Sequence, residues 1–177
     1  MKLVTDITEL TKPCKEWIFT IPSLDEEFAK KLVNSMYEYK GFGLAANQIG
    51  VRSRVFAMVG PDHDFVCFNP KIESYSEEVI EMEEGCLSFP NLILNVKRAR
   101  HVEISFADYN GDRTTRVFTG MTSRIIQHEM EHLDGELFFQ GMSRYKIEKA
   151  IKEAKKLGTD YSKMGLLRYA KKEKENV

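Results

Sequence analysis

The most constraining feature of the sequence is the pentapeptide His-Glu-Met-Glu-His at residues 128–132. Its two histidines are four positions apart, so their imidazoles can reach one metal ion if the segment is an α-helix, in which such positions share a face. The neighbouring residues favour a helix, because Thr122 or Ser123 can cap its start and Gly135 can end it. The sequence therefore predicts a metal-binding helix with Glu129 next to the first ligand.

Two further amphipathic helices are predicted, at residues 24–40 and 143–157. The first follows a capping-box pair, Ser23 and Glu26, and ends before Gly41. Short runs rich in Val, Ile and Phe predict strands at 54–59, 65–72 and 101–107, and a hairpin in which 101–109 and 113–119 flank an Asn-Gly-Asp turn. We therefore expect an α+β fold in which a mostly antiparallel sheet packs around the central 128–132 helix, with an N-terminal and a C-terminal helix.

The composition narrows the class of protein. With 177 residues, 42% of them hydrophobic, and a net charge of −1, the chain fits one domain over residues 1–177 without a general attraction to nucleic acid or membrane. No apolar run approaches the roughly 20 residues of a membrane helix, and the first residues do not look like a signal peptide. Three widely spaced cysteines suit reduced thiols. We expect a monomer that acts in the cytoplasm, or in an organelle or a host cytosol, depending on its source.

A catalytic zinc-type site needs a third protein ligand and one position left for water. One class of metalloprotease takes a further histidine six residues after the second, but that position holds Phe138. Glu148 or Glu153 on the following helix is a second possibility. The third is Cys86, which a short strand-like stretch next to a glycine can present to the helix as a thiolate. Spacing alone leaves these open, while Cys67, in an apolar strand, is expected to be an ordinary buried residue.

Three stretches of the sequence carry a resemblance to a known family. They read GFGLAANQIG at residues 41–50, EGCLSFP at 84–90 and QHEMEHLDG at 127–135. In this order and separation they resemble the three signature motifs of the peptide deformylase family, whose members remove the formyl group from the initiator methionine of nascent chains. The resemblance covers roughly residues 24 to 140. It implies a metal-dependent hydrolase that acts on N-formyl-methionyl peptides.

The resemblance also implies roles for individual residues. The metal ligands would be Cys86, His128 and His132, with water in the fourth place. Glu129 would accept the proton of that water and pass it to the departing amine. The donors to the tetrahedral oxyanion would be the side-chain amide of Gln48 and the backbone N–H of Leu87. The resemblance further implies Fe(II) as the native metal, with zinc, nickel or cobalt possible in purified protein.

Substrate contacts are expected from the same motifs. Gly43 resembles the position that hydrogen-bonds the substrate main chain, because a glycine lets another backbone approach closely. Alignment on the motifs brings apolar side chains to the walls of a methionine pocket, with Glu84 as a further substrate-binding residue; the expected walls are Phe42, Met82, Met121 and Ile125.

The chain also departs from the family pattern. Glu131 stands where the family often has aspartate, and we expect its side chain to face away from the metal. Residues 1–19 do not follow the usual beginning, and residues 91–96 lack the usual glycine after Pro90.

Two other functions compete with a deformylase. One is a general zinc endopeptidase that uses Glu148 or Glu153 as its third ligand. The other is a noncatalytic module that binds the ribosome, because residues 144–177 hold 11 Lys and Arg against 5 Asp and Glu, a net charge of +6. A basic C-terminal helix and tail from about residue 143 also allow a deformylase to bind the ribosome.

Overall fold

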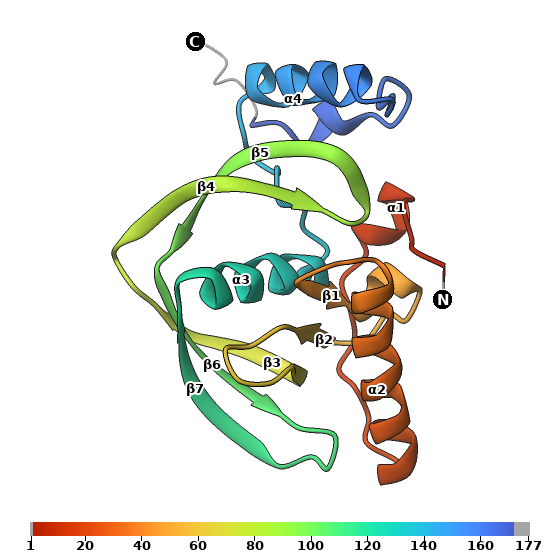
Figure 1. Cartoon of the computed structure of the whole chain (residues 1–177), viewed down its shortest axis with the longest axis vertical. Coiled ribbons are helices and arrows are strands. Elements are labelled where there is room, and N and C mark those ends of the chain that lie inside the picture. The colour runs from red at the N-terminus through yellow and green to blue at the C-terminus, as the bar shows by residue number, and fades with distance from the viewer. Residues whose placement is uncertain (1, 172–177) are drawn as a thin grey trace, which may run out of the picture.

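Two antiparallel sheets and one central helix organise the protein (Figure 1), as a computed structural model describes it for residues 2–171. The larger sheet has the order β1 (Gly43–Ala45), β2 (Val55–Met58), β3 (Phe65–Tyr75), β6 (His101–Ala107) and β7 (Arg113–Thr119). The smaller sheet pairs β4 (Val79–Cys86) with β5 (Phe89–Ala99). The antiparallel pairing and the accompanying helices confirm the predicted α+β class.

Helix α3 (Gly120–Asp134) carries the 128–132 pentapeptide between the two sheets. In Figure 1, β4 and β5 arch over this helix and the larger sheet lies on its other side. The helix starts earlier than its expected caps. Thr119 is the N-cap residue, and the Ser123 hydroxyl donates instead to the Ala99 carbonyl, 2.9 Å away. The predicted cap at Thr122 or Ser123 is therefore wrong, because tertiary contacts use the Ser123 side chain.

Helices α2 (Pro22–Glu38) and α4 (Arg144–Lys156) match the other two predicted helices within a few residues. Ser143 caps α4, its side chain accepting from the Lys146 N–H. The capping box expected at α2 is wrong, because Pro22 starts this helix two residues earlier and Ser23 lies inside its first turn. The short helix α1 (Ile7–Leu10) and the 3₁₀ turns η1 (Ala46–Ile49) and η2 (Leu166–Tyr169) were not predicted.

Strands β4 and β5 were not predicted from the sequence, apart from the short strand-like stretch expected at Cys86. Residues 78–84 include four glutamates, so β4 lacks the clean alternation of polar and apolar residues that marks a half-buried strand. Its partner β5 does alternate, with buried Leu92, Leu94 and Val96 between exposed residues. Pairing with β5 therefore holds β4 in place despite its charge.

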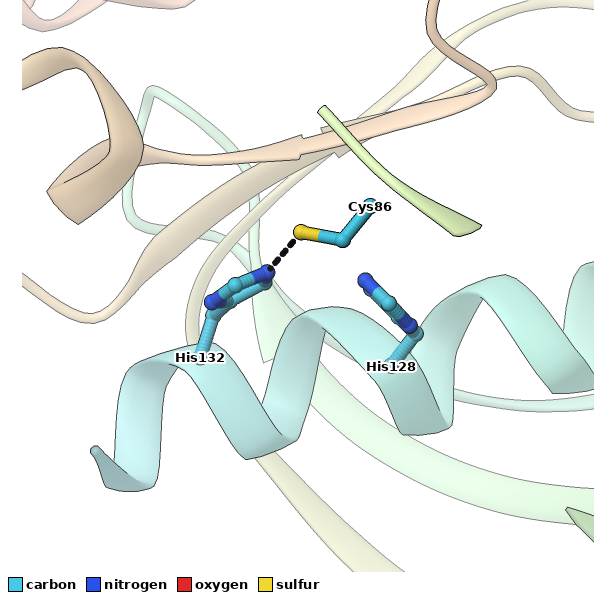
Figure 2. A group of neighbouring side chains, drawn as sticks. All are labelled: Cys86, His128 and His132. Carbon is cyan, nitrogen blue, oxygen red and sulfur yellow. Dashed lines mark hydrogen bonds between the residues drawn. The ribbon is translucent and has the colours of Figure 1, made fainter. Parts of the chain in front are cut away.

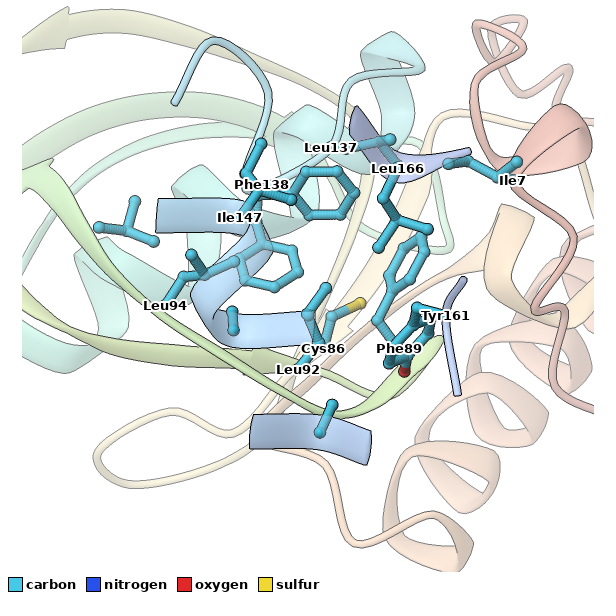
Figure 3. Close-up of a cluster of buried hydrophobic side chains, with 14 of the residues drawn as sticks. Ile7, Cys86, Phe89, Leu92, Leu94, Leu137, Phe138, Ile147, Tyr161 and Leu166 are labelled. Carbon is cyan, nitrogen blue, oxygen red and sulfur yellow. The ribbon is translucent and has the colours of Figure 1, made fainter. Parts of the chain in front are cut away.

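The end of β4 is anchored in a hydrophobic cluster between β5, α4 and the segment after α3 (Figure 3). Cys86 is a member, together with large side chains that include Phe89, Leu92, Leu94, Leu137, Phe138, Ile147, Tyr161 and Leu166. The C-terminal segment contributes to this cluster, and the Tyr161 hydroxyl donates to the Pro90 carbonyl at 2.6 Å. Packing of this kind fixes the position of the Cys86 backbone.

The N-terminal segment forms hydrogen bonds with the centre of the molecule. The Val4 N–H donates to the Gln48 carbonyl at 2.7 Å, and the Cys14 N–H donates to the Leu133 carbonyl at 2.8 Å. The segment therefore contacts both the turn after β1 and the end of α3. No helix in the described part of the chain is long and apolar enough to cross a membrane.

Replacing Gly135 with alanine is expected to destabilise the fold more than the same change at Gly111. Both glycines have left-handed φ values, 76° and 88°, which cost about 1–2 kcal/mol for other residues. At Gly135 the added Cβ would also lie 2.7 Å from the Thr11 carbonyl oxygen, whereas at Gly111 it meets nothing within 4 Å. We expect about 1–3 kcal/mol of further destabilisation at Gly135 from this overlap. Urea unfolding of both variants measures the difference, and equal losses would contradict it.

Candidate metal centre

Three potential ligands meet where the end of β4 faces α3. His128 and His132 extend from the same face of the helix toward Cys86 (Figure 2). The Cys86 Sγ lies 3.1 Å from the His132 Nε2, and the ligand atoms of all three residues lie within 4.8 Å of one another. All three side chains are buried. Among the described residues, this is the one cluster of histidine, cysteine and carboxylate side chains with such spacing.

The donor set suits a transition-metal ion. Atoms bonded to one ion at about 2.1 Å for nitrogen and 2.3 Å for sulfur lie about 3–4 Å apart, which is close to the separation seen here. Three protein ligands would leave the fourth position of a tetrahedral ion for water or substrate, as catalytic sites require. In addition, the His132 Nδ1 has no hydrogen-bond partner among the described residues, which leaves Nε2 as the nitrogen directed at the ion.

The alternative third ligands lie elsewhere. Glu148 pairs with Arg144 and Glu153 with Lys156, each on the exposed surface of α4. Phe138 occupies the position that holds a third histidine ligand in one class of metalloprotease. Its ring packs on the ring of His128, with 5.5 Å between the centroids.

Glu84 contacts the His128 ring at Nδ1, the nitrogen that faces away from the other ligands. One of its oxygens lies 3.1 Å from the His128 Nδ1, and the carboxylate also accepts two hydrogen bonds of 2.9 Å from Arg98 and another from Arg124. Burial alone would raise the pKa of Glu84, but its bonds to His128 and Arg98 lower it to about 2. We expected Glu84 to bind substrate. In the structure its carboxylate is instead hydrogen-bonded to His128, Arg98 and Arg124. Such an outer partner orients a ligand and sets its tautomer.

Glu131 is linked to the same group of charges. Its side chain faces Arg98, which bridges it to Glu84, so it points away from the ligand atoms yet belongs to the network behind them. Arg98 and Arg124 are both buried, at 5% exposure each, and sequence reasoning missed them. They lie in separate elements without a shared motif, so only the fold reveals that they converge on Glu84.

Glu129 lies within α3 beside the ligands and is 4% exposed. Burial raises the pKa of its carboxyl to about 7, against an opposing effect of His128. Its Oε1 lies so close to Gly43 that a Cβ there would be 2.4 Å away, which explains the glycine at this position. A carboxylate with a pKa near neutrality is suited to proton transfer.

A hydrogen bond to its side-chain carbonyl orients the amide of Gln48. Its Oε1 accepts from the Ala45 N–H at 2.9 Å, which turns the amide Nε2 toward Ser88 Oγ at 3.1 Å and Cys86 Sγ at 3.5 Å. The buried amide therefore presents a donor beside the ligands. Leu87 follows Cys86 directly, so its backbone lies at the same edge of the site.

A cavity of about 330 Å³ opens onto these residues. Its lining includes Phe42, Gly43, Glu84, Met121 and Ile125 from the predicted substrate set, and also Gln48, Leu87 and Glu129. Phe42 and Met121 are exposed at 70% and 53%, which suits the mouth, whereas Ile125 is buried.

Met82 does not line this cavity. Met82 lies four residues before Cys86 in β4, where it pairs with Val96 of β5. Strand geometry therefore places it about 13 Å along β4 from that cysteine. The motif alignment could not show this, because residues 79–86 were not recognised as a strand.

Comparison with known proteins adds an independent finding. The family model described as polypeptide deformylase matches residues 3–148. A peptide deformylase of Synechocystis is 37% identical over 134 residues, covering 73% of this chain and 71% of the relative.

Solved structures of peptide deformylases are also similar to this chain. The peptide deformylase of Synechococcus elongatus in complex with actinonin has a TM-score of 0.81 and 32% identity, covering 88% of this chain and 86% of that one. Peptide deformylase 1B of Arabidopsis thaliana in complex with an inhibitor has a TM-score of 0.77 and 31% identity, covering 89% and 90%.

Proposed function

Because this chain belongs to the polypeptide deformylase family, we propose that Cys86, His128 and His132 hold its catalytic metal ion and that Glu129 moves the proton. The protein is a metal-dependent deformylase, which removes the formyl group from the initiator methionine of nascent chains. The observation that carries the residue assignment is the meeting of the Cys86 sulfur with both histidines of the pentapeptide.

A metal ion held by Cys86, His128 and His132 would supply Lewis-acid chemistry, by polarising the formyl carbonyl and lowering the pKa of a bound water. Glu129 accepts a proton from the water that attacks the formyl carbon. The Gln48 amide and the Leu87 N–H donate to the oxygen that becomes negative. Glu129 then delivers the proton to the peptide nitrogen as the C–N bond breaks, which yields formate and a free amino terminus.

The substrate backbone is held at an open strand edge. Strand β1 is the edge strand of the larger sheet and pairs only with β2 in that sheet, so its other edge can accept an extended peptide next to Gly43. Phe42, Met121 and Ile125 then surround the methionine side chain in the cavity. Glu129 and Ile125 lie close against Gly43. A formyl group bound next to Gly43 would fit there more easily than the larger acetyl group.

Formate release tests the activity directly. The parent protein should release formate from formyl-Met-Ala-Ser and leave acetyl-Met-Ala-Ser intact. The endopeptidase alternative predicts cleavage of internal peptide bonds in unformylated peptides. That product pattern, without formate, would contradict the proposal.

The native metal is proposed to be Fe(II), with zinc, nickel or cobalt able to occupy the same ligands. Affinity favours zinc over ferrous iron in most such sites, so occupancy in cells follows metal availability. Metal analysis after anaerobic purification, compared with activity, tests this. Full activity that tracks zinc content alone would contradict it.

A ribosome contact through α4 is a further proposal, and it concerns location rather than chemistry. Lys149 and Lys152 are exposed on α4, outside the ion pairs that engage Lys146, Lys155 and Lys156. Phosphate contacts of such side chains attract RNA in a salt-dependent way. Lys172 and Lys174 of the predicted basic tail lie outside the described residues.

Substituting both Lys149 and Lys152 with glutamate should weaken cosedimentation with ribosomes while leaving hydrolysis of formyl-Met-Ala-Ser unchanged. Substitution is preferable to truncation after Gly158, because truncation removes Tyr161 and Leu166 from the core. Cosedimentation that responds neither to these changes nor to added salt would contradict the contact. We further propose that the protein is one domain and acts as a cytoplasmic monomer, and light scattering on the purified chain tests its oligomeric state.

A further inference from the structure

Asn47 joins the turn that carries Gln48 to the end of the metal-binding helix. It lies in η1, immediately before Gln48, and its side chain is buried. Its Nδ2 donates to the backbone carbonyl of His132 at 2.7 Å, across 85 residues of sequence. The contact therefore links the turn of one expected oxyanion donor to the backbone of one expected metal ligand.

Two atoms of these same residues have unmet hydrogen-bonding needs. When the His132 Nε2, which faces Cys86, binds the proposed metal ion, the ring proton lies on Nδ1, which is then a buried donor. This Nδ1 has no partner among residues 2–171, and the same holds for the buried Asn47 Oδ1, which is an acceptor. The amide of Asn47 cannot be reversed, because its nitrogen is the atom that bonds the His132 carbonyl.

His128 has a hydrogen-bond partner at its Nδ1, which His132 lacks among the described residues. The His128 Nδ1 lies 3.1 Å from the Glu84 carboxylate, so its ring is already oriented. Histidines that bind metal almost always donate their second ring N–H to such a partner. An ordered water needs two to four polar partners, and these two buried atoms on contacting residues offer it one donor and one acceptor.

We propose that Asn47 is a positioning residue for His132, whose Nδ1–H reaches the Asn47 Oδ1 through one buried water. This bridge sets the tautomer and the plane of the imidazole that completes the metal site. The inference rests on the proposed function, because it takes Cys86, His128 and His132 as the ligands. The family resemblance assigns a role to Gln48 and none to Asn47.

Two substitutions separate this role from the backbone contact. Asn47→Leu removes both the acceptor and the donor, whereas Asn47→Asp keeps an acceptor oxygen and loses the donor to the His132 carbonyl. Zinc affinity, measured by competition with a chelator, should fall about 10–100-fold in Asn47→Leu, the usual effect of losing an outer partner. In Asn47→Asp, which keeps the acceptor oxygen, zinc affinity should fall less than in Asn47→Leu.

The matched control is Asn69→Gly. Asn69 also clamps a backbone segment, accepting from the Trp17 N–H at 2.6 Å and donating to the Trp17 carbonyl at 2.9 Å, but it is not part of the metal cluster. Glycine tolerates its left-handed φ of 46°. This variant should lose stability and keep the zinc affinity of the parent.

Histidine NMR of the zinc-loaded protein gives a readout that does not depend on activity. The Nδ1-bound proton of His132 should exchange slowly in the parent and in Asn47→Asp, and rapidly in Asn47→Leu. Equal losses of affinity in both Asn47 variants, or rapid exchange in the parent, would overturn the bridge. If the parent bound no zinc, the proposed metal site itself would fail, and the inference with it. If Asn47→Leu does not fold, the exchange rate of the His132 Nδ1 proton in the parent and the zinc affinity of Asn47→Asp still test the proposal.

Discussion

Cys86→Ala is expected to lose metal binding and deformylation together. The change removes the thiolate and leaves only the two histidines of α3, so zinc affinity should fall more than about 100-fold, beyond the usual effect of removing an outer partner. Dialysis against a weak chelator followed by metal analysis measures the loss, and formate release from formyl-Met-Ala-Ser measures the activity.

The matched control for this change is Cys67→Ala. Cys67 is fully buried in β3, and burial raises the pKa of its thiol well above the usual range, as fits a structural residue outside the metal site. This variant should lose some stability through the cavity it creates and keep its metal. Metal retention in Cys86→Ala with loss in Cys67→Ala would contradict the assignment of ligands.

Glu129→Gln is expected to keep the metal and lose most turnover. The amide fits the same space against Gly43 but cannot accept the proton of the attacking water. Proton transfer by a positioned side chain typically contributes a factor of about 10²–10⁴, so kcat should fall by this amount. Steady-state kinetics on formylated peptide, with metal content measured on the same sample, tests it.

The second glutamate of the pentapeptide provides a control for this prediction. Glu131→Gln should retain most activity, because Glu84 keeps its two hydrogen bonds from Arg98 and its contact with His128. If Glu129→Gln turned over at the parent rate while Glu131→Gln did not, the proton-transfer role would belong elsewhere.

Local patterns in the sequence anticipated much of the fold. The helices with regular apolar spacing, α2, α3 and α4, were found within a few residues, since their periodicity is a property of the sequence itself. Strand β4 was missed because its glutamates interrupt alternation. One of them, Glu84, is buried with Arg98 and Arg124, so tertiary pairing stabilises a strand that local preference disfavours.

The candidate site divides in the same way. Residues inside the motifs, such as Cys86 and Gln48, could be named from sequence because the family pattern carries their spacing. Arg98, Arg124 and the role of Asn47 could not, because their contacts with the site depend on how separate elements pack. Met82 was predicted as a pocket wall from its closeness to a motif in sequence, and it does not line the cavity at the candidate site.

The central claim is that Cys86, His128 and His132 bind one metal ion, and X-ray absorption at the metal edge tests it most directly. For zinc-loaded parent protein we expect one sulfur at about 2.3 Å and two imidazole nitrogens at about 2.1 Å, with one lighter atom completing the shell. A first shell of nitrogen and oxygen alone, without sulfur, would contradict the proposed site.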